Sequence, residues 1–332
     1  MTDTRRRDVL VVATVLLLGP LAAVAEETRR VRRVAVLIGY AENDPEAQLR
    51  LIAFKEGLAT LGWVEDRNVR FDVRWSGGDP NRASVHAKEL VALRPDVILS
   101  NTTPATAAVQ RETQTVPIVF TVVADPIGSG FIKSLSRPGG NITGLLYYES
   151  TVAEKWLELL KQIAPQMTRV AVMFNPKTAS YVEYYLQPLR TAATRLGVKM
   201  FTAPVDSDAD IERTIGALGS EVGSGLITMV DSFLLVHRKP IIALAARYKV
   251  PAMYYTTPFV EDGGLIAYGV DAKDLFRRAA RYVDRILRGK TPQDLPVEQP
   301  TKFEFAINLR TARAFGLTVP QSILLRADKV IE

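Results

Sequence analysis

Several polar side chains follow directly after apolar, strand-like runs of the sequence. The run at 95–101 ends in Asn101 and is followed by Thr102 and Thr103. The run at 224–231 ends in Asp231. Ligands of open α/β sheets bind outside the carboxyl ends of the strands, so these groups would face a shared crevice. Hydroxyls beside the free N–H groups of a helix start suit a carboxylate, and an acid suits an amine. The pattern predicts a site for a small molecule that carries both groups.

The same strand ends carry further candidates for this site. They are Asp125 and Asn175, each before a proline, and the tyrosines Tyr40, Tyr147 and Tyr268. Tyrosine rings would contact an apolar part of the ligand. Two other interpretations stay open, because a polar residue before proline also caps a helix start and a tyrosine at a core edge also serves packing alone. Asp231 has the same alternative role as a helix cap.

The composition argues against several catalytic and metal-binding classes. The chain has two histidines, His86 and His237, and no cysteine. Thiolate catalysis, a disulfide framework and a transition-metal site are therefore not expected. No nucleophile elbow, Walker-type loop or complete dinucleotide-binding glycine pattern follows a strand. We expect no cofactor, no metal and no catalytic residue, and a carboxylate-based α/β enzyme stays open as an alternative.

The charge of the chain does not indicate a nucleic-acid partner. The net charge is +6, but the 42 Lys and Arg residues are scattered among 36 acids. Dense basic runs occur at residues 5–7 and 29–33, both near the N-terminus. A mildly basic surface accounts for this distribution, and no nucleic-acid binding is expected.

The elements that would position the candidate residues occur twice along the chain. The run RVAVLIGY at 33–40 returns as RVAVMFNP at 169–176, and each precedes a helical stretch that ends in Leu-Gly. Four further pairs follow in the same order: 69–75 with 199–205, 95–101 with 224–231, 116–122 with 250–256, and 139–148 with 263–270. Apolar runs that alternate with amphipathic helices are typical of parallel sheets covered on both faces. The sequence therefore predicts an α/β protein with two doubly wound parallel-sheet lobes.

The first 25 residues form a separate segment. Basic residues at 5–7, a short apolar run at 9–24 and the sequence Ala23-Val24-Ala25 match a secretory signal peptide. We expect cleavage after Ala25. Because no cysteine is present for lipid attachment, the mature chain should be free in the periplasm. The sequence RRDVL at 6–10 also resembles a twin-arginine export signal, so the export route stays open.

Long runs of the remaining chain resemble bacterial ABC-transporter substrate-binding proteins. These runs are ADPIGSGFIKSLSRPGG (124–140), GGNITGL (139–145), EDGGLIAYG (261–269) and the whole segment 295–332. The likeness extends from about Arg32 to Glu332, and it points to the family that includes tryptophan- and tyrosine-type binders of the type I periplasmic-binding fold. Members often have serine where this chain has Ala267, and the loss of this possible hydrogen-bond donor weakens any transfer of ligand identity.

The resemblance implies a clamshell whose two lobes are joined by three hinge segments and close on one ligand. Its cleft positions would be the loop around Tyr40, Asn101 to Thr103, Asp125, Asn175, Asp231 and Tyr268. We expect an N-terminal lobe from residues 30–146 plus 270–292 and a C-terminal lobe from 147–269 plus 293–332. The hinge would lie around residues 144–150, 268–272 and 290–302.

The resemblance also implies a role in transport. The protein would be the periplasmic solute-binding component of an ABC importer, acting as a monomer. It would capture a small carboxylate-bearing, amino-acid-like ligand, and whether that ligand is aromatic stays open. It would then deliver that ligand to an inner-membrane permease driven by an ATPase. A periplasmic sensory binding protein stays open as an alternative. The sensing module of a soluble transcription regulator would need a helix-turn-helix where this chain has its signal-like segment.

Overall fold

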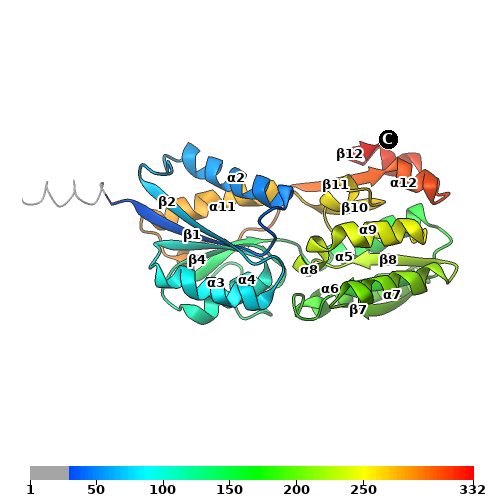
Figure 1. Ribbon diagram of the computed structural model, residues 1–332, viewed down its shortest axis with the longest axis horizontal. Coiled ribbons are helices and arrows are strands. Elements are labelled where there is room, and N and C mark those ends of the chain that lie inside the picture. Colours follow the sequence, from blue (N-terminus) through cyan, green and yellow to red (C-terminus); the bar gives the residue numbers. More distant parts are fainter. Residues whose placement is uncertain (1–29) are drawn as a thin grey trace, which may run out of the picture.

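The computed structural model describes residues 30–332 and consists of two α/β lobes that lie side by side (Figure 1). The first lobe, here called the N lobe, has a parallel five-stranded sheet in the order β2-β1-β3-β4-β5. The second, the C lobe, has a seven-stranded sheet in the order β12-β11-β10-β9-β8-β6-β7, in which β10 and β11 are antiparallel and the other neighbours parallel. The two sheets confirm the predicted fold class. The predicted signal peptide, residues 1–25, lies outside the described residues.

The N lobe places two helices on each face of its sheet. Its elements are β1 (Arg32–Ile38), α2 (Pro45–Thr60), β2 (Val69–Trp75), α3 (Pro80–Ala92), β3 (Val97–Asn101), α4 (Thr103–Glu112), β4 (Ile118–Val123), β5 (Ile142–Leu146), α11 (Ala272–Leu287) and the 3-10 turn η1 (Pro292–Asp294). Helix α2 packs against α11, and α3 packs against α4. Helices α2 and α3 each begin with an aspartate cap followed by proline, as the sequence predicts for a helix start.

The C lobe repeats this arrangement and adds two strands at one edge. Helix α5 packs against α6, and α7 packs against α9. Its elements are α5 (Val152–Ile163), β6 (Arg169–Phe174), α6 (Val182–Arg195), β7 (Lys199–Pro204), α7 (Asp208–Gly219), β8 (Ser224–Thr228), α8 (Ser232–Val236), α9 (Arg238–Arg247), β9 (Ala252–Tyr254), α10 (Pro258–Glu261), β10 (Ile266–Val270), β11 (Phe303–Asn308), α12 (Leu309–Ala314), α13 (Gln321–Leu324) and β12 (Lys329–Ile331).

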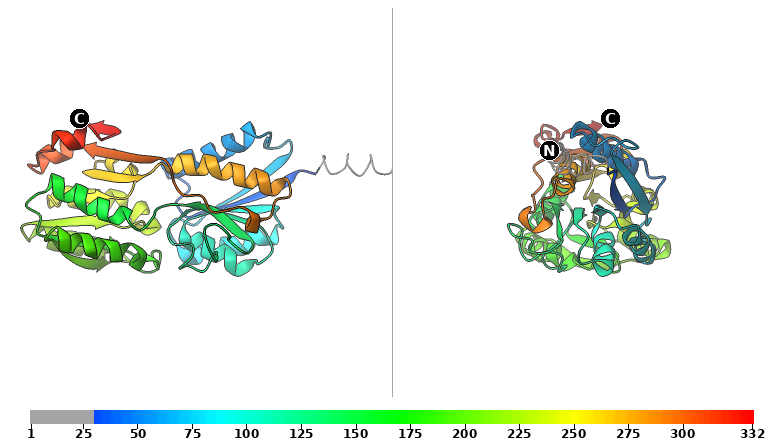
Figure 2. Two further views of the ribbon diagram at one scale, coloured as in Figure 1. Left: turned by 180° about the vertical axis from the view of Figure 1, so that it is seen from behind. Right: turned by 90° about the vertical axis from the view of Figure 1, so that its left-hand side faces the viewer.

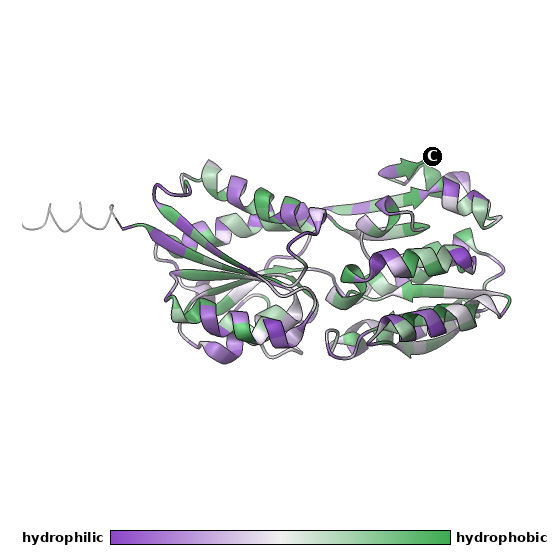
Figure 3. Cartoon of the chain, viewed as in Figure 1, coloured by the Kyte–Doolittle hydropathy of each residue, from purple (hydrophilic) through white to green (hydrophobic). Residues whose placement is uncertain are grey.

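The central strands are apolar because helices cover both of their faces. Every residue of β3, β4, β5 and β8 is buried. Figure 3 shows these central strands largely in green, whereas purple and green residues alternate along the helices that cover them. Strands buried on both faces lose the alternation of polar and apolar residues, so they appear in the sequence as continuous apolar runs. These rigid layers fix the positions of the loops at the strand ends.

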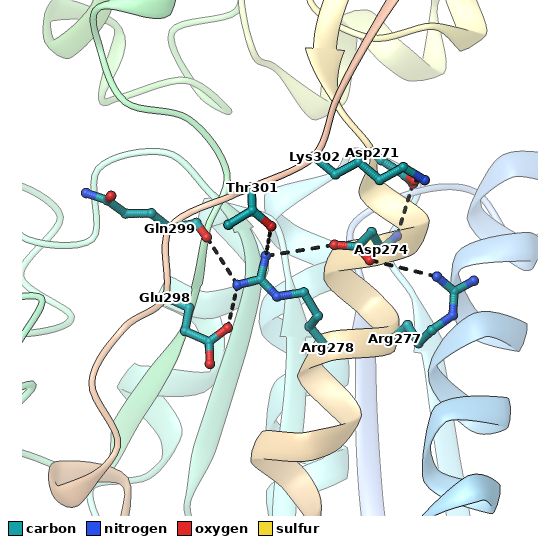
Figure 4. A network of polar contacts seen from close by, with 8 residues as sticks. All are labelled: Asp271, Asp274, Arg277, Arg278, Glu298, Gln299, Thr301 and Lys302. Carbon is teal, nitrogen blue, oxygen red and sulfur yellow. Dashed lines mark hydrogen bonds and ion pairs between the residues drawn. The ribbon is translucent and has the colours of Figure 1, made fainter. Parts of the chain in front are cut away.

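The chain passes between the lobes in three segments (Figure 2). The first, residues 147–151, joins β5 to α5; the second, at Asp271, joins β10 to α11; the third, residues 295–302, joins η1 to β11. Polar contacts tie the third segment to α11 (Figure 4). Arg278 pairs with Glu298 and donates to the Gln299 carbonyl oxygen at 3.2 Å, and Lys302 Nζ lies 2.7 Å from Asp271 Oδ2.

Candidate ligand-binding site

Loops from the two sheets meet at the boundary between the lobes. The loop after β1 reaches the start of α9, where Asp44 contacts Arg238. The loop after β2 reaches α8, where Gly78 packs against Val236. Tyr181, just before α6, lies beside Thr103 at the start of α4. The loops that follow the strands of one sheet therefore face those of the other, as expected for a crevice lined by both lobes.

Buried polar atoms without a hydrogen-bond partner among residues 30–332 are concentrated at this boundary. Ten residues carry such atoms; Asp72, Arg169 and Ser224 lie elsewhere, and seven lie here: Arg50, Asn101, Thr102, Thr103, Thr121, Tyr147 and Tyr185. Buried polar groups normally find partners, and one left unpaired costs roughly 1–3 kcal/mol. These side chains come from α2, the β3–α4 junction, β4, the first crossing segment and α6. Unpaired groups that converge from separate elements indicate a site for a polar ligand.

Arg50 supplies the positive charge of this site. Its side chain is fully buried, its guanidinium carbon lies 5.2 Å from the centre of the Tyr40 ring, and its Nε and Nη1 atoms have no partner among the described residues. A buried cation destabilises a protein unless it is paired. Arginine binds carboxylates through two parallel N–H bonds, so Arg50 fits a carboxylate ligand.

Sequence reasoning missed Arg50, although a signal was available. Within α2 it lies three residues after Ala47 and four before Phe54, both buried. Residues at this spacing share one face of a helix, so Arg50 interrupts an otherwise apolar stripe. A charged residue on the buried face of a helix is rare without a partner, so this spacing would have identified Arg50 as a candidate.

The Asn101–Thr103 segment has the geometry of a binding loop. Thr102 has a φ of 84°, a conformation that a β-branched residue rarely adopts, and its side chain does not cap α4. Its hydroxyl and that of Thr103 remain unpaired among the described residues. Gly39, at the end of β1, approaches so closely that a Cβ there would clash with the Thr102 hydroxyl. The surrounding structure thus holds Thr102 in a strained conformation with its donor free.

Tyrosines provide the aromatic wall of the site. The ring of Tyr147 lies 6.5 Å from that of Tyr255, and the ring of Tyr185 lies 6.4 Å from Tyr181 and 5.8 Å from Trp156. Burial raises the pKa of Tyr147 and Tyr185, so both hydroxyls remain protonated donors near neutral pH. Tyr181 and Tyr185 belong to the sequence SYVEYY and were not predicted, whereas Tyr40 and Tyr147 were.

Asp231 takes the alternative role that the sequence left open. It accepts hydrogen bonds from the Phe233 N–H at 2.9 Å, which caps α8, and from the Asn175 N–H at 2.6 Å. The Thr178 hydroxyl is a third donor. Burial raises the pKa of Asp231 to about 6, although these hydrogen bonds lower it. Asp231 therefore holds the loop after β6, including Asn175, against the loop after β8.

Asp125 lies at the edge of the same region. Its Oδ1 accepts from the Gly128 N–H at 2.8 Å, so it caps the turn after β4. Its charge adds to the effect of burial in raising the pKa of Tyr184 and Tyr185, two residues of α6 in the other lobe. No cation within residues 30–332 forms an ion pair with this half-buried carboxylate. Asp125 is therefore available to a ligand amine.

The structure does not bring Tyr268 to this cluster. Successive side chains of a strand point to opposite faces, and the neighbouring Gly269 faces Tyr148 and Tyr255. Tyr268 therefore faces away and stacks on Phe303, with ring centres 5.6 Å apart. There it lines a separate hinge-side pocket of about 390 Å³ together with Glu149 and Gln299. We do not include Tyr268 in the proposed site.

In the part of the chain that the structure describes, no group of three or more His, Cys, Asp or Glu residues is placed to hold a metal ion. The site is built from one arginine, hydroxyls, an amide, two carboxylates and aromatic rings. This set can bind a zwitterion with an apolar portion.

Comparisons with known proteins identify a family. The sequence model described as "ABC transporter substrate binding protein" matches residues 41–331. A tyrosine-binding protein of Clostridioides difficile (strain R20291) is 26% identical over 265 residues, which are 80% of this chain and 75% of that protein. A conserved domain protein of Vibrio cholerae has a solved structure with a TM-score of 0.84 and 30% identity, covering 91% of this chain and 100% of that chain. An ABC domain from Streptococcus pneumoniae, solved in complex with L-Trp, has a TM-score of 0.81 and 27% identity, covering 90% and 99%.

Proposed function

Since the chain belongs to the family of ABC transporter substrate-binding proteins, we propose that it captures an amino-acid-like ligand between its lobes for an ABC importer. The observation that carries this proposal is the set of unpaired buried polar groups around Arg50. The ligand carboxylate would pair with the Arg50 guanidinium and accept hydrogen bonds from Thr102 and Thr103. The ligand amine would pair with Asp125 or Asp231.

We propose an aromatic side chain for the ligand. The rings of Tyr40, Tyr147, Tyr185 and Tyr255 offer stacked and edge-on contacts to such a group. The names of two relatives support this choice, since one is a tyrosine-binding protein and the other was solved with L-Trp. Tyr147 and Tyr185 also keep free hydroxyls, which suit a hydroxyl or indole N–H on the ligand.

The proposed mechanism is capture by closure. Thr103 belongs to the N lobe and Tyr185 to the C lobe, so a ligand that contacts both stabilises the closed state over the open one. A single chain supplies both lobes, which is why we expect the protein to act as a monomer. The closed, loaded protein would then dock on an inner-membrane permease, whose ATPase drives release and transport.

Purified protein should retain or bind L-tryptophan or L-tyrosine. Binding to the folded state alone should stabilise it by about 2.7 kcal/mol at a ligand concentration 100 times the dissociation constant. Thermal unfolding with each amino acid, together with native mass spectrometry, measures this effect. Tryptamine is the matched control, because it lacks the carboxylate that Arg50 would bind, and it should give little stabilisation. The absence of a shift with any amino acid, or recovery of a chemically altered ligand, would contradict a transport role.

We also propose export to the periplasm with removal of residues 1–25. No helix between residues 30 and 332 is long and apolar enough to cross a membrane. N-terminal sequencing of periplasmic protein should begin at Glu26. Replacement of Arg6 and Arg7 by lysine should stop export through a twin-arginine route and leave a general secretory route working. Periplasmic protein that still carries residues 1–25 would refute processing.

A further inference from the structure

Beside the ligand site, one ion pair joins the two lobes directly. Arg238, at the start of α9, contacts Asp44, at the start of α2, with Nη1 and Oδ2 2.5 Å apart. Both side chains are 9% exposed. Outside the three crossing segments, this is the one ion pair between the lobes in the part of the chain that the structure describes.

Each half of the pair is held in place by its own lobe. Asp44 Oδ1 accepts from the Ala47 N–H at 2.9 Å and so caps α2. Arg238 Nε donates to Asp262 Oδ2 at 2.7 Å, and its Nη1 also donates to the Leu235 carbonyl oxygen at 3.1 Å. Neither side chain needs to be ordered anew when the lobes meet. Groups that are already positioned before they associate lose little conformational entropy.

We propose that Asp44 and Arg238 form an interlobe latch that sets ligand affinity by favouring the closed state, without contact with the ligand. This inference rests on the proposed function. The partners of both side chains leave little capacity for a ligand, because the two Asp44 oxygens accept from Ala47 and Arg238. Arg238 in turn donates from Nε to Asp262 and from Nη1 to Asp44 and the Leu235 carbonyl oxygen.

Loss of the ion pair should favour the open state, because opening returns the remaining unpaired charge to water. Removal of one partner from a buried ion pair leaves the other charge desolvated and unpaired. In most proteins this destabilises the fold. Here separation of the lobes would return the remaining charge to water while each lobe stays folded. A protein whose binding-competent state is less populated binds its ligand more weakly in proportion.

A ligand-free distance measurement tests the latch. Because the chain has no cysteine, Asn81→Cys in α3 and Glu212→Cys in α7, both exposed positions, provide one labelling site in each lobe. Asp44→Asn removes the charge but keeps a good helix cap. We expect Asp44→Asn and Arg238→Gln each to shift the interlobe distances toward an open form. Each should also weaken L-tryptophan or L-tyrosine binding about 10- to 100-fold.

Two further variants sharpen the test. The double variant should be no weaker than either single variant, since both remove the same contact. Glu89→Gln breaks an exposed ion pair with Arg74 inside the N lobe and should leave the distances unchanged. Unchanged distances in both single variants, even with lowered melting temperatures, would overturn the latch. Because this measurement needs no ligand, the latch can fail while amino-acid binding stands, and it can succeed even if neither amino acid binds.

Discussion

Replacement of Arg50 by methionine should nearly abolish ligand binding and should raise the melting temperature of the ligand-free protein. Loss of one partner of a buried charge pair costs about 3–5 kcal/mol, which corresponds to roughly 100- to 1000-fold or more in affinity. Without ligand, the same guanidinium is buried and its Nε and Nη1 have no partner within residues 30–332. Methionine has a similar length and no charge to desolvate. Its introduction should therefore stabilise the fold by about 1–4 kcal/mol.

Calorimetric titration with L-tryptophan and thermal unfolding of the same samples measure the two effects. Arg50→Lys should keep the charge but lose the bidentate hydrogen bonding to the ligand carboxylate, so its affinity should lie between those of the wild type and Arg50→Met. Lys55→Met is the control on the same helix, because Lys55 forms an exposed ion pair with Glu65. Its affinity should not change. An Arg50→Met protein with wild-type affinity would remove Arg50 from the ligand site.

The opposite signs of the two effects follow from the role of a binding site. A site that holds unpaired charge before its ligand arrives lowers the stability of the free protein. The strained backbone at Thr102 is a second example, since a φ of 84° is unfavourable for a threonine. The unpaired charge and the strained backbone both lower the stability of the free protein, as expected of groups that are positioned to bind a ligand.

The fold was predictable because its signals are local and repeated. The continuous apolar runs that became β3, β4, β5 and β8 follow from burial on both faces, which depends on sheet type alone. The loop at Asn101–Thr103 was predictable for a related reason, since it directly follows one of these runs. The position of this loop at the boundary between the lobes was expected because ligands of open α/β sheets bind at the carboxyl ends of the strands.

The rest of the site depends on contacts between lobes. Arg50 and Tyr185 lie inside helices, and which of their faces meets the other lobe is set by how the lobes dock. Tyr268 shows the same limit within a strand, because a shift of one residue reverses the face that a side chain meets. Capping and ligand binding use the same residue types, so the sequence alone left the role of Asp231 open.

Asp231 should make the ligand-free protein less stable as pH rises from about 4 to about 6. Its pKa is about 6 in the folded protein against an ordinary value of 3.8. Below pH 4 both folded and unfolded chains carry the proton. Between pH 4 and about 6 the Asp231 carboxyl ionises in the unfolded chain but keeps its proton in the folded one, so the free energy of unfolding falls. At higher pH the carboxyl is ionised in both states, and its contribution to the free energy of unfolding stays constant. The loss amounts to about 3 kcal/mol. Asp231→Asn cannot titrate, so the difference in unfolding free energy between the two proteins should change by this amount between pH 4 and 7.

Ligand binding should reverse this penalty if Asp231 pairs with the ligand amine. An ammonium group beside the carboxylate favours its ionised form and lowers its pKa. Affinity for L-tryptophan should then rise with pH between about 5 and 7 and level off above that range. The Asp231→Asn protein should bind weakly without this rise. Titrations across that range distinguish the two acids of the site, because a wild-type affinity that stays constant would leave Asp231 as a helix cap and assign the amine to Asp125. In that case the unfolding measurement would still follow pH as described, since it depends on the burial of Asp231 and not on the ligand.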